Sequence, residues 1–214
     1  MSNKNITTDE LSLLAFKSSI TLDPYHMVQN WSTSSSLCTW VGVTCDEQHG
    51  RVHSLDLSNM ELEGTISPHL GNLSFLVYLD LQGNYFTGEF PQSLFGLHRL
   101  KLLDLSHNEL VGGIPLKMGD LSKLQHLNLG HNNFSGFIPQ SMFNLKKLEH
   151  LDFSFNFIKG TIPNVIGQLH VLRILDFSNN KMSGTIPQTI SNLSSLEEIY
   201  LANNSFSDMC LSFD

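Results

Sequence analysis

Two groups of side chains in this 214-residue chain have the types and spacing that chemistry requires. The first is a set of aspartates separated by one fixed spacing or its multiples, among them Asp80, Asp104 and Asp152. On adjacent strands such carboxylates stand about 4.8 Å apart, close enough to share acid–base work. An active site is local, however, whereas this column extends along the chain. We therefore interpret it as part of a structural repeat and expect no catalytic residue.

Histidines form the second group, which consists of His107, His126, His131 and His150. Imidazoles bind metal ions, and they also titrate in mildly acidic surroundings. No Cys or Glu completes a closed ligand set at tight spacing, so we predict neither a metal nor another cofactor. A pH-sensitive contact and ordinary solvated histidines remain as competing interpretations. The sequence also lacks a nucleophile elbow, a phosphate loop and a zinc-binding helix motif, and we predict that the chain is not an enzyme.

A sequence repeat must position these side chains. It is 24 residues long, as the distance in sequence from Leu55 to Leu79 shows. One column of the repeat is apolar throughout and contains Leu55, Leu79, Leu103, Leu127, Leu151, Leu175 and Ile199. A second apolar column lies two residues further on, so each repeat contains a short segment with the period of a strand. An Asn column follows, and an inward amide there can bond backbone groups that the turn leaves unpaired. Stacked units of this kind bury a continuous core and leave the strand face concave and open.

The unit LQHLNLGHNNFSGFIPQSMFN, residues 124–144, resembles the plant-type leucine-rich repeat, and the resemblance covers residues 51–206. Residues 7–45 resemble the N-terminal cap of plant leucine-rich-repeat receptor-like kinases and receptor-like proteins. The stretch LGNLSFLVYLDL is most similar to the kinase subfamily that includes immune receptors for bacterial patterns. The implied fold is an α/β leucine-rich-repeat solenoid, a right-handed curved superhelix with a parallel concave sheet. We assign 1–48 to a helical cap, 49–206 to about seven repeats and 207–214 to a truncated tail without a C-terminal cap.

The cap sequence predicts two helices. Thr7 and Glu10 form a capping box that starts an amphipathic helix, in which Leu11, Leu14 and Phe16 cover the first repeat. The pair at residues 23–24, Asp followed by Pro, then predicts a second short helix. A cap of this kind is needed because the end of a solenoid otherwise exposes its core.

The cysteines bear on the compartment of the protein. Cys38 and Cys45 are close enough in sequence to close a disulfide in an oxidising compartment, which would staple the cap to the first strand. The alternative is a pair of buried free thiols in a cytosolic protein. Cys210 is left without an assignment.

The seventh repeat departs from the pattern, because Asp208 stands at the glycine position and the chain stops at Asp214. We therefore interpret the chain as the front part of a receptor ectodomain. An apolar end should be left uncovered there. Its expected members are Ile199, Leu201, Phe206, Leu211 and Phe213.

Features of the sequence point to different cellular locations. No apolar stretch of about 20 residues is present and the N-terminus is polar, so we expect neither a membrane contact nor a signal sequence in this segment. The resemblance implies an extracellular location and a membrane-anchored full-length protein. Six Asn-x-Ser/Thr glycosylation sequons suit that location. They begin at Asn5, Asn30, Asn72, Asn133, Asn192 and Asn203. The net charge of −8 and the lack of a basic run argue against nucleic acid.

Outward columns beside the inward leucines predict a binding surface on the concave face. They mix aromatic, imidazole, aliphatic and carboxylate side chains. The predicted contact residues are Tyr78, Asp80, Asp104, His126, His131, His150, Asp152, Phe155, Ile174 and Tyr200. The resemblance implies recognition of a peptide or protein elicitor, with a co-receptor as a further partner. The alternatives are a secreted inhibitor resembling polygalacturonase-inhibiting proteins and a truncated receptor fragment without function.

Overall fold

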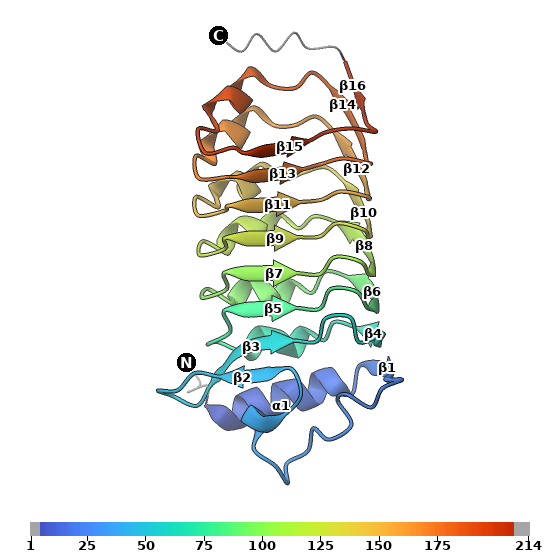
Figure 1. The fold of residues 1–214 in the computed structure, drawn as a ribbon, viewed down its shortest axis with the longest axis vertical. Coiled ribbons are helices and arrows are strands. Elements are labelled where there is room, and N and C mark those ends of the chain that lie inside the picture. The colour runs from blue at the N-terminus through green and yellow to red at the C-terminus, as the bar shows by residue number, and fades with distance from the viewer. Residues whose placement is uncertain (1–4, 208–214) are drawn as a thin grey trace.

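The computed structural model describes residues 5–207 and forms an elongated, curved stack of repeats (Figure 1). Short strands on one face of the stack pair into an eight-stranded sheet. Its neighbours are parallel and in register, except that the first two strands are antiparallel. In chain order the strands are β2 (Val43–Cys45), β3 (Val52–Asp56), β5 (Tyr78–Asp80), β7 (Leu102–Asp104), β9 (His126–Asn128), β11 (His150–Asp152), β13 (Ile174–Asp176) and β15 (Glu198–Tyr200).

A second sheet of eight strands follows the side of the stack where each repeat turns away from the first sheet (Figure 1). The sequence pattern did not predict it. The chain reaches this sheet through residues with left-handed backbone, such as His107 at φ 53°, and leaves it at glycines such as Gly112 at φ 94°. The strands are β1 (Ile20–Leu22), β4 (Glu63–Thr65), β6 (Tyr85–Glu89), β8 (Glu109–Gly113), β10 (Asn133–Gly136), β12 (Phe157–Gly160), β14 (Lys181–Gly184) and β16 (Ser205–Phe206).

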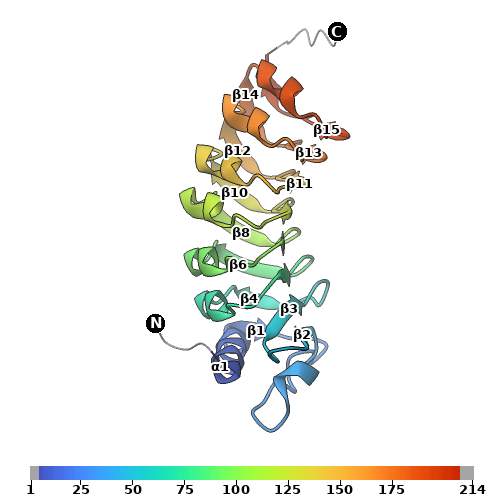
Figure 2. The same ribbon diagram turned by 90° about the vertical axis from the view of Figure 1, so that its left-hand side faces the viewer.

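Helical segments close each repeat. The N-terminal α1 (Ile6–Lys17) is followed by short 3-10 helices, most of which begin directly after the repeated proline. The proline fixes its φ and has no N–H to satisfy at this position. The 3-10 helices are η1 (Leu37–Thr39), η2 (Pro68–Asn72), η3 (Gln92–Gly96), η4 (Leu116–Asp120), η5 (Gln140–Asn144), η6 (Asn164–Gln168) and η7 (Gln188–Asn192). Figure 2 shows η2 to η7 lined up along one side of the stack, above α1. The predicted solenoid is therefore confirmed.

The repeated asparagines join each repeat to the one before it. Asn132 is buried, and its Nδ2 donates to the carbonyl oxygens of Leu105 at 2.9 Å, Leu129 at 3.2 Å and Gly130 at 3.2 Å. Its Oδ1 accepts the backbone N–H of Leu110 at 3.0 Å. Asn84, Asn108, Asn156, Asn180 and Asn204 make equivalent bonds. The expectation of an inward amide that satisfies turn backbone is confirmed.

We predict that Asn132→Ala destabilises the protein by about 1 to 3 kcal/mol, because the buried N–H of Leu110 loses its side-chain acceptor. The measurement is urea denaturation followed by circular dichroism. Asn144→Ala is the matched control, since Asn144 is exposed at the end of η5. An equal loss of stability in the two variants would contradict the structural role of the asparagine column.

The cap helix covers the first repeat, as predicted, but it starts differently. Its N-cap is Asn5, which forms the capping box with Thr8, so the predicted box of Thr7 and Glu10 was wrong. The buried positions follow from the true start and are 9, 12, 13 and 16. Leu11 is consequently 61% exposed. Leu13 occupies the core position that we had assigned to Leu11. Phe16 packs against Phe86 with ring centroids 5.8 Å apart.

The second predicted cap helix is absent from the described residues. The carboxylate of Asp23 does accept the N–H groups of Met27 and Val28, as a helix cap would. However, residues 24–30 form turns only, and His26 adopts left-handed backbone with φ 56°, which ends any helix at once. The disulfide between Cys38 and Cys45 is confirmed and joins η1 to the end of β2.

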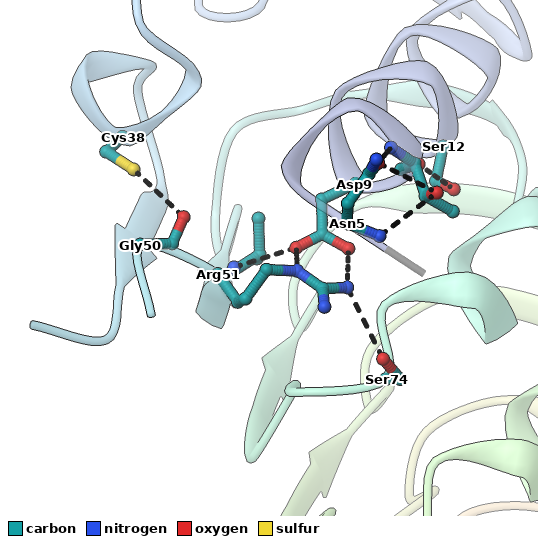
Figure 3. A network of polar contacts seen from close by, with 9 residues as sticks. Asn5, Asp9, Ser12, Cys38, Gly50, Arg51 and Ser74 are labelled. Atoms are coloured by element: carbon teal, nitrogen blue, oxygen red, sulfur yellow. Dashed lines mark hydrogen bonds and ion pairs between the residues drawn. The ribbon is translucent and has the colours of Figure 1, made fainter. Parts of the chain in front are cut away.

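A buried ion pair ties the cap helix to the first repeat (Figure 3). The guanidinium of Arg51 donates from Nε to Asp9 Oδ2 and from Nη2 to Asp9 Oδ1, both at 2.7 Å. Asp9 also accepts the N–H of Val52 at 3.1 Å, and Arg51 reaches Ser74 Oγ at 3.3 Å. The guanidinium lies 4.7 Å from the ring centre of Phe75. Both charged groups are buried, so each depends on the other for solvation.

We expect Asp9→Asn to cost about 3 to 5 kcal/mol of folding free energy, because the buried guanidinium of Arg51 loses the carboxylate that accepts two of its hydrogen bonds. The double variant Asp9→Asn/Arg51→Met should be more stable than Asp9→Asn alone, since Asn still accepts the N–H of Val52 and no charge remains. Thermal unfolding of both variants measures this. A double variant no more stable than the single one would show that the charge itself is not the cause.

The last repeat presents an apolar groove that includes two of the five residues of the predicted apolar end. Ile199 is 41% exposed, whereas Leu201 and Phe206 are half-buried. Their neighbours form a groove of about 310 Å³ that is lined by Ile186, Ile190, Ser191, Leu196, Glu197, Ile199 and Leu201. Leu211 and Phe213, with Asp208, Cys210 and most of the predicted tail, lie outside the described residues.

Candidate ligand-binding surface

The concave sheet places one outward residue of each repeat in a single row. Strand register pairs Tyr78 with Leu102, Leu102 with His126, and His126 with His150. The row continues through Ile174 to Glu198. From Leu79 to Leu175 the neighbouring inward leucines have no exposed surface, so only this row and its flanks are available to a ligand there.

A shallow depression of about 340 Å³ opens beside this row. It is formed by the first residues of β9, β11 and β13 and by the residues directly before these strands and before β15. Its lining consists of Gln125, His126, Glu149, His150, Arg173, Ile174 and Glu197. Thus three of the ten predicted contact residues, His126, His150 and Ile174, come together in one place.

His126 lies on the floor of the depression, and its side chain is 30% exposed. Its ring centre lies 4.2 Å from that of His150, and Nε2 lies 3.9 Å from Asp104 Oδ2. Burial lowers the pKa of His126, and the neighbouring His150 lowers it further, while Asp104 and Asp152 act in the opposite direction. The imidazole is therefore neutral at neutral pH and serves as a hydrogen-bonding group without charge.

The rim of the depression is charged, and the sequence reasoning missed it. Arg173 donates to Glu197 from Nε and Nη2 at 2.8 Å and 2.9 Å. Glu149 accepts from Gln125 at 3.3 Å. All four positions precede a concave strand by one residue and recur once in each repeat. That column was a usable signal, because residues beside a strand share its exposed edge.

The aspartate column has a structural role. Asp104 is only 6% exposed, and its Oδ1 accepts both the N–H and the hydroxyl of Ser106, at 2.9 Å and 2.6 Å. Asp80 and Asp152 likewise accept the N–H two residues ahead, at 3.0 Å and 2.8 Å. Each carboxylate thereby closes the turn that follows its strand. The turns therefore use part of the hydrogen-bonding capacity of these three predicted contact residues.

A second cluster lies past the other end of the strands. The rings of His107 and His131 stack with centroids 4.0 Å apart, and His131 stacks on Phe155 at 4.1 Å. Phe155 is 48% exposed. Burial and His107 lower the pKa of His131. The four histidines are thus divided between two separate pairs, and the described residues contain no group of three His, Cys, Asp or Glu that could hold a metal ion.

The remaining two predicted contacts lie away from both clusters. Tyr78 is exposed on β5 beside the ring of His53, with centroids 5.5 Å apart. Tyr200 is exposed on β15, and its hydroxyl donates to Glu198 at 2.8 Å. They lie toward opposite ends of the concave sheet, so a ligand touching both would have to follow most of the stack (Figure 1).

The sequons are accessible in most cases. Asn72 is half-buried, and the other five are exposed at Asn5, Asn30, Asn133, Asn192 and Asn203. Asn133 lies on the second sheet, so a glycan there would project from that side of the solenoid. In the described part of the chain, no helix is both long and apolar enough to cross a membrane.

This fold and its open concave row define a binding solenoid, and comparison with known families names the class. The model for the leucine rich repeat N-terminal domain matches residues 6–46. The leucine rich repeat model matches residues 50–110, 117–158 and 153–206. The chain belongs to the leucine-rich-repeat family.

Individual relatives are receptor kinases of plants. The LRR receptor-like serine/threonine-protein kinase EFR of Arabidopsis thaliana is 43% identical over 95 residues, which are 44% of this chain and 9% of EFR. Receptor kinase-like protein Xa21 of Oryza sativa subsp. japonica is 46% identical over 90 residues, 39% of this chain and 9% of Xa21. The match thus spans less than a tenth of either relative.

A solved structure shares nearly the whole arrangement. It is the LRR ectodomain of the plant membrane receptor kinase GASSHO1/SCHENGEN3 from Arabidopsis thaliana, in complex with CASPARIAN STRIP INTEGRITY FACTOR 2. The TM-score is 0.90 at 32% identity, and the match covers 92% of this chain and 24% of that one. The fold and the N-terminal cap therefore have a solved counterpart among plant receptor ectodomains.

The pKa of Asp80 yields a test of the concave electrostatics. Burial, together with Asp104 and Asp56, raises it from 3.8 to about 6. Between pH 4 and pH 6 the unfolded chain therefore loses this proton before the folded chain does, and stability falls as the pH rises through that window.

Asp80→Asn keeps the acceptor for the N–H of Gln82 and removes the charge. We expect it to match the wild type below pH 4 and to be more stable by about 1 kcal/mol at pH 7, since the half-buried carboxylate is partly screened by water. Urea denaturation at the two pH values measures the difference. An Asn variant less stable than the wild type at pH 7 would contradict the raised pKa.

Proposed function

We propose that this chain is the ligand-recognition part of the extracellular region of a plant receptor-like kinase or receptor-like protein, and that it binds a peptide along its concave face. The depression around His126, His150 and Ile174 carries the proposal. It opens beside the row of outward residues whose type changes from repeat to repeat. Side chains of this mixture are typical of binding hot spots. The complex of GASSHO1/SCHENGEN3 with CASPARIAN STRIP INTEGRITY FACTOR 2 supports the same use of the fold for recognition.

The charges favour a peptide with a basic side chain. Glu149 and Glu197 line the depression, and Asp104 and Asp152 act on the pKa of His126 as negative charges, whereas the guanidinium of Arg173 is already paired with Glu197. A Lys or Arg of the ligand would approach Glu149 while an apolar neighbour contacts Ile174. Acidic and basic surfaces that complement each other steer association and fix the register of the bound chain.

The rigid sheet supports this mode of binding. Every concave strand is bonded to its neighbours on both sides, except at the ends of the stack, so the depression is formed before the ligand arrives. A preformed site loses little conformational entropy on binding. We assign no enzymatic role to the segment. A co-receptor would contact the edge of the same complex, as the second partner.

An extracellular location follows from the same proposal. The disulfide between Cys38 and Cys45 is stable in oxidising compartments, and five exposed sequons are open to glycosylation. The full-length protein would be anchored in the plasma membrane by segments outside this chain.

A displayed library of linear peptides, selected on the glycosylated chain, tests the proposal. Ile174→Arg places a cation in the depression, and Val111→Arg, on exposed β8 of the second sheet, is the matched control. Enriched peptides should contain Lys or Arg, and Ile174→Arg should weaken them about tenfold or more while the control leaves affinity unchanged. Peptides equally weakened by both variants, or by neither, would locate binding elsewhere and overturn the proposal.

The histidines give the pH dependence its sign. Burial and the neighbouring His150 lower the pKa of His126 from 6.5, and its protonation adds positive charge beside a basic ligand, so affinity should fall as the pH decreases below 6.5. In the double variant His126→Gln/His150→Gln, affinity should no longer depend on pH in this range. An unchanged pH profile would remove the histidines from the site.

A further inference from the structure

A row of exposed cations follows the edge of the concave sheet where the strands begin. It consists of Arg99, Lys101, Lys123 and Lys147, and we call it the basic stripe. Three of its members, Arg99, Lys123 and Lys147, occupy the same position in successive repeats. The chain as a whole has 12 Lys and Arg against 20 Asp and Glu, so a stripe of one sign is unexpected on this surface.

The repeat geometry holds these side chains in line. Each of the three lies in an identical turn, closed by the N–H of Leu100, Leu124 or Leu148 donating to the carbonyl three residues back. Main-chain bonds from Lys101 to Val77 and from Gln125 to Lys101 fasten successive turns. The cations therefore follow one another at about the strand separation of 4.8 Å. Figure 2 turns this edge of the stack toward the viewer.

The protein itself does not neutralise the basic stripe. Within residues 5–207, Arg51 and Arg173 are the cations of Arg or Lys that form ion pairs with carboxylates. No member of the basic stripe forms such a pair within this range. Arg99 lies over the ring of Phe75 at 4.1 Å, which orients its guanidinium without cancelling its charge. The nearest acid in sequence to Lys147 is Glu149, which accepts from Gln125. Adjacent like charges cost stability, and an external anion would offset that cost.

The sequons leave the stripe uncovered. Asn72 and Asn192 occupy one repeat position, at the ends of η2 and η7, and the stripe lies between them along the stack. At the same position the intervening repeats carry no sequon, but instead Gly96, Asp120, Asn144 and Gln168. Glycosylation at both sequons would flank the stripe and leave it open.

We propose that the basic stripe binds a linear acidic polysaccharide with one carboxylate on each sugar, a polyuronate. Such a chain carries one negative charge on every ring, so several carboxylates can reach the row of cations at once. Its chain of rings is stiffer than an acidic peptide, so it loses less conformational entropy when it lies along a rigid edge. The flexible stems of the lysines absorb the mismatch in spacing between carboxylates and cations. The stripe borders the depression, because the carbonyl oxygen of Lys101 accepts the N–H groups of Gln125 and His126, but its cations require a ligand of the opposite charge.

Calorimetric titration of the glycosylated chain with a de-esterified 1,4-linked oligogalacturonate tests the inference. The stripe variant is Arg99→Gln/Lys123→Gln/Lys147→Gln. The control variant, Lys117→Gln/Lys159→Gln/Lys181→Gln, removes the same charge from exposed residues of η4 and the second sheet. We expect the stripe variant to bind about tenfold more weakly and with a shallower dependence on salt, and the control to bind as the wild type does.

Three results would overturn the proposal. They are no binding by the wild type, equal weakening in both variants, and binding of an oligoglutamate of equal charge as tightly as the oligogalacturonate. The fully methyl-esterified sugar should not bind, since it lacks the charge. Unchanged thermal unfolding of the stripe variant shows that a loss of binding is not a loss of fold. Because peptide binding at the depression should survive in this variant, failure of either proposal can be told apart from failure of the other.

Discussion

The structure depends on one requirement, that every repeat must satisfy the backbone groups its own turn leaves unpaired. The buried amide of each repeated asparagine meets it by bonding main-chain atoms of its own repeat and of the preceding one, as Asn132 does with Leu105 and Leu110. Consecutive repeats therefore share one backbone geometry, and strand register follows. The cap helix supplies the missing neighbour at the N-terminal end, where the buried pair of Asp9 and Arg51 fixes it.

The features that recur in every repeat for this reason could be predicted from the sequence alone. The inward leucines, the asparagines and the disulfide followed from column and spacing, because each has a physical role that recurs. The start of the cap helix did not, since Asn5 and Thr7 are both competent N-caps and only packing against the first repeat selects between them. The second sheet was missed because the chain enters it through residues with left-handed backbone, such as His107. The residue type does not predict that conformation.

The candidate site was only partly predictable for a related reason. His126, His150 and Ile174 were found because they lie in an outward column of the strands. Glu149 and Arg173 were not, because they precede the strands and become neighbours only through stacking. The basic stripe shows the same effect, since a search for runs of Lys and Arg along the chain cannot find cations that lie one whole repeat apart. In a solenoid, surfaces must be read across repeats.

The account rests on a separation between inward columns, which specify the fold, and outward columns, which specify recognition. The most direct measurement replaces five outward residues by Ser in one variant and determines its unfolding midpoint and its affinity for library-selected peptides. These residues are Tyr78, His126, His150, Ile174 and Tyr200. The account predicts a midpoint close to that of the wild type and a loss of peptide binding. A collapse of stability, or peptide affinity equal to that of the wild type, would contradict it.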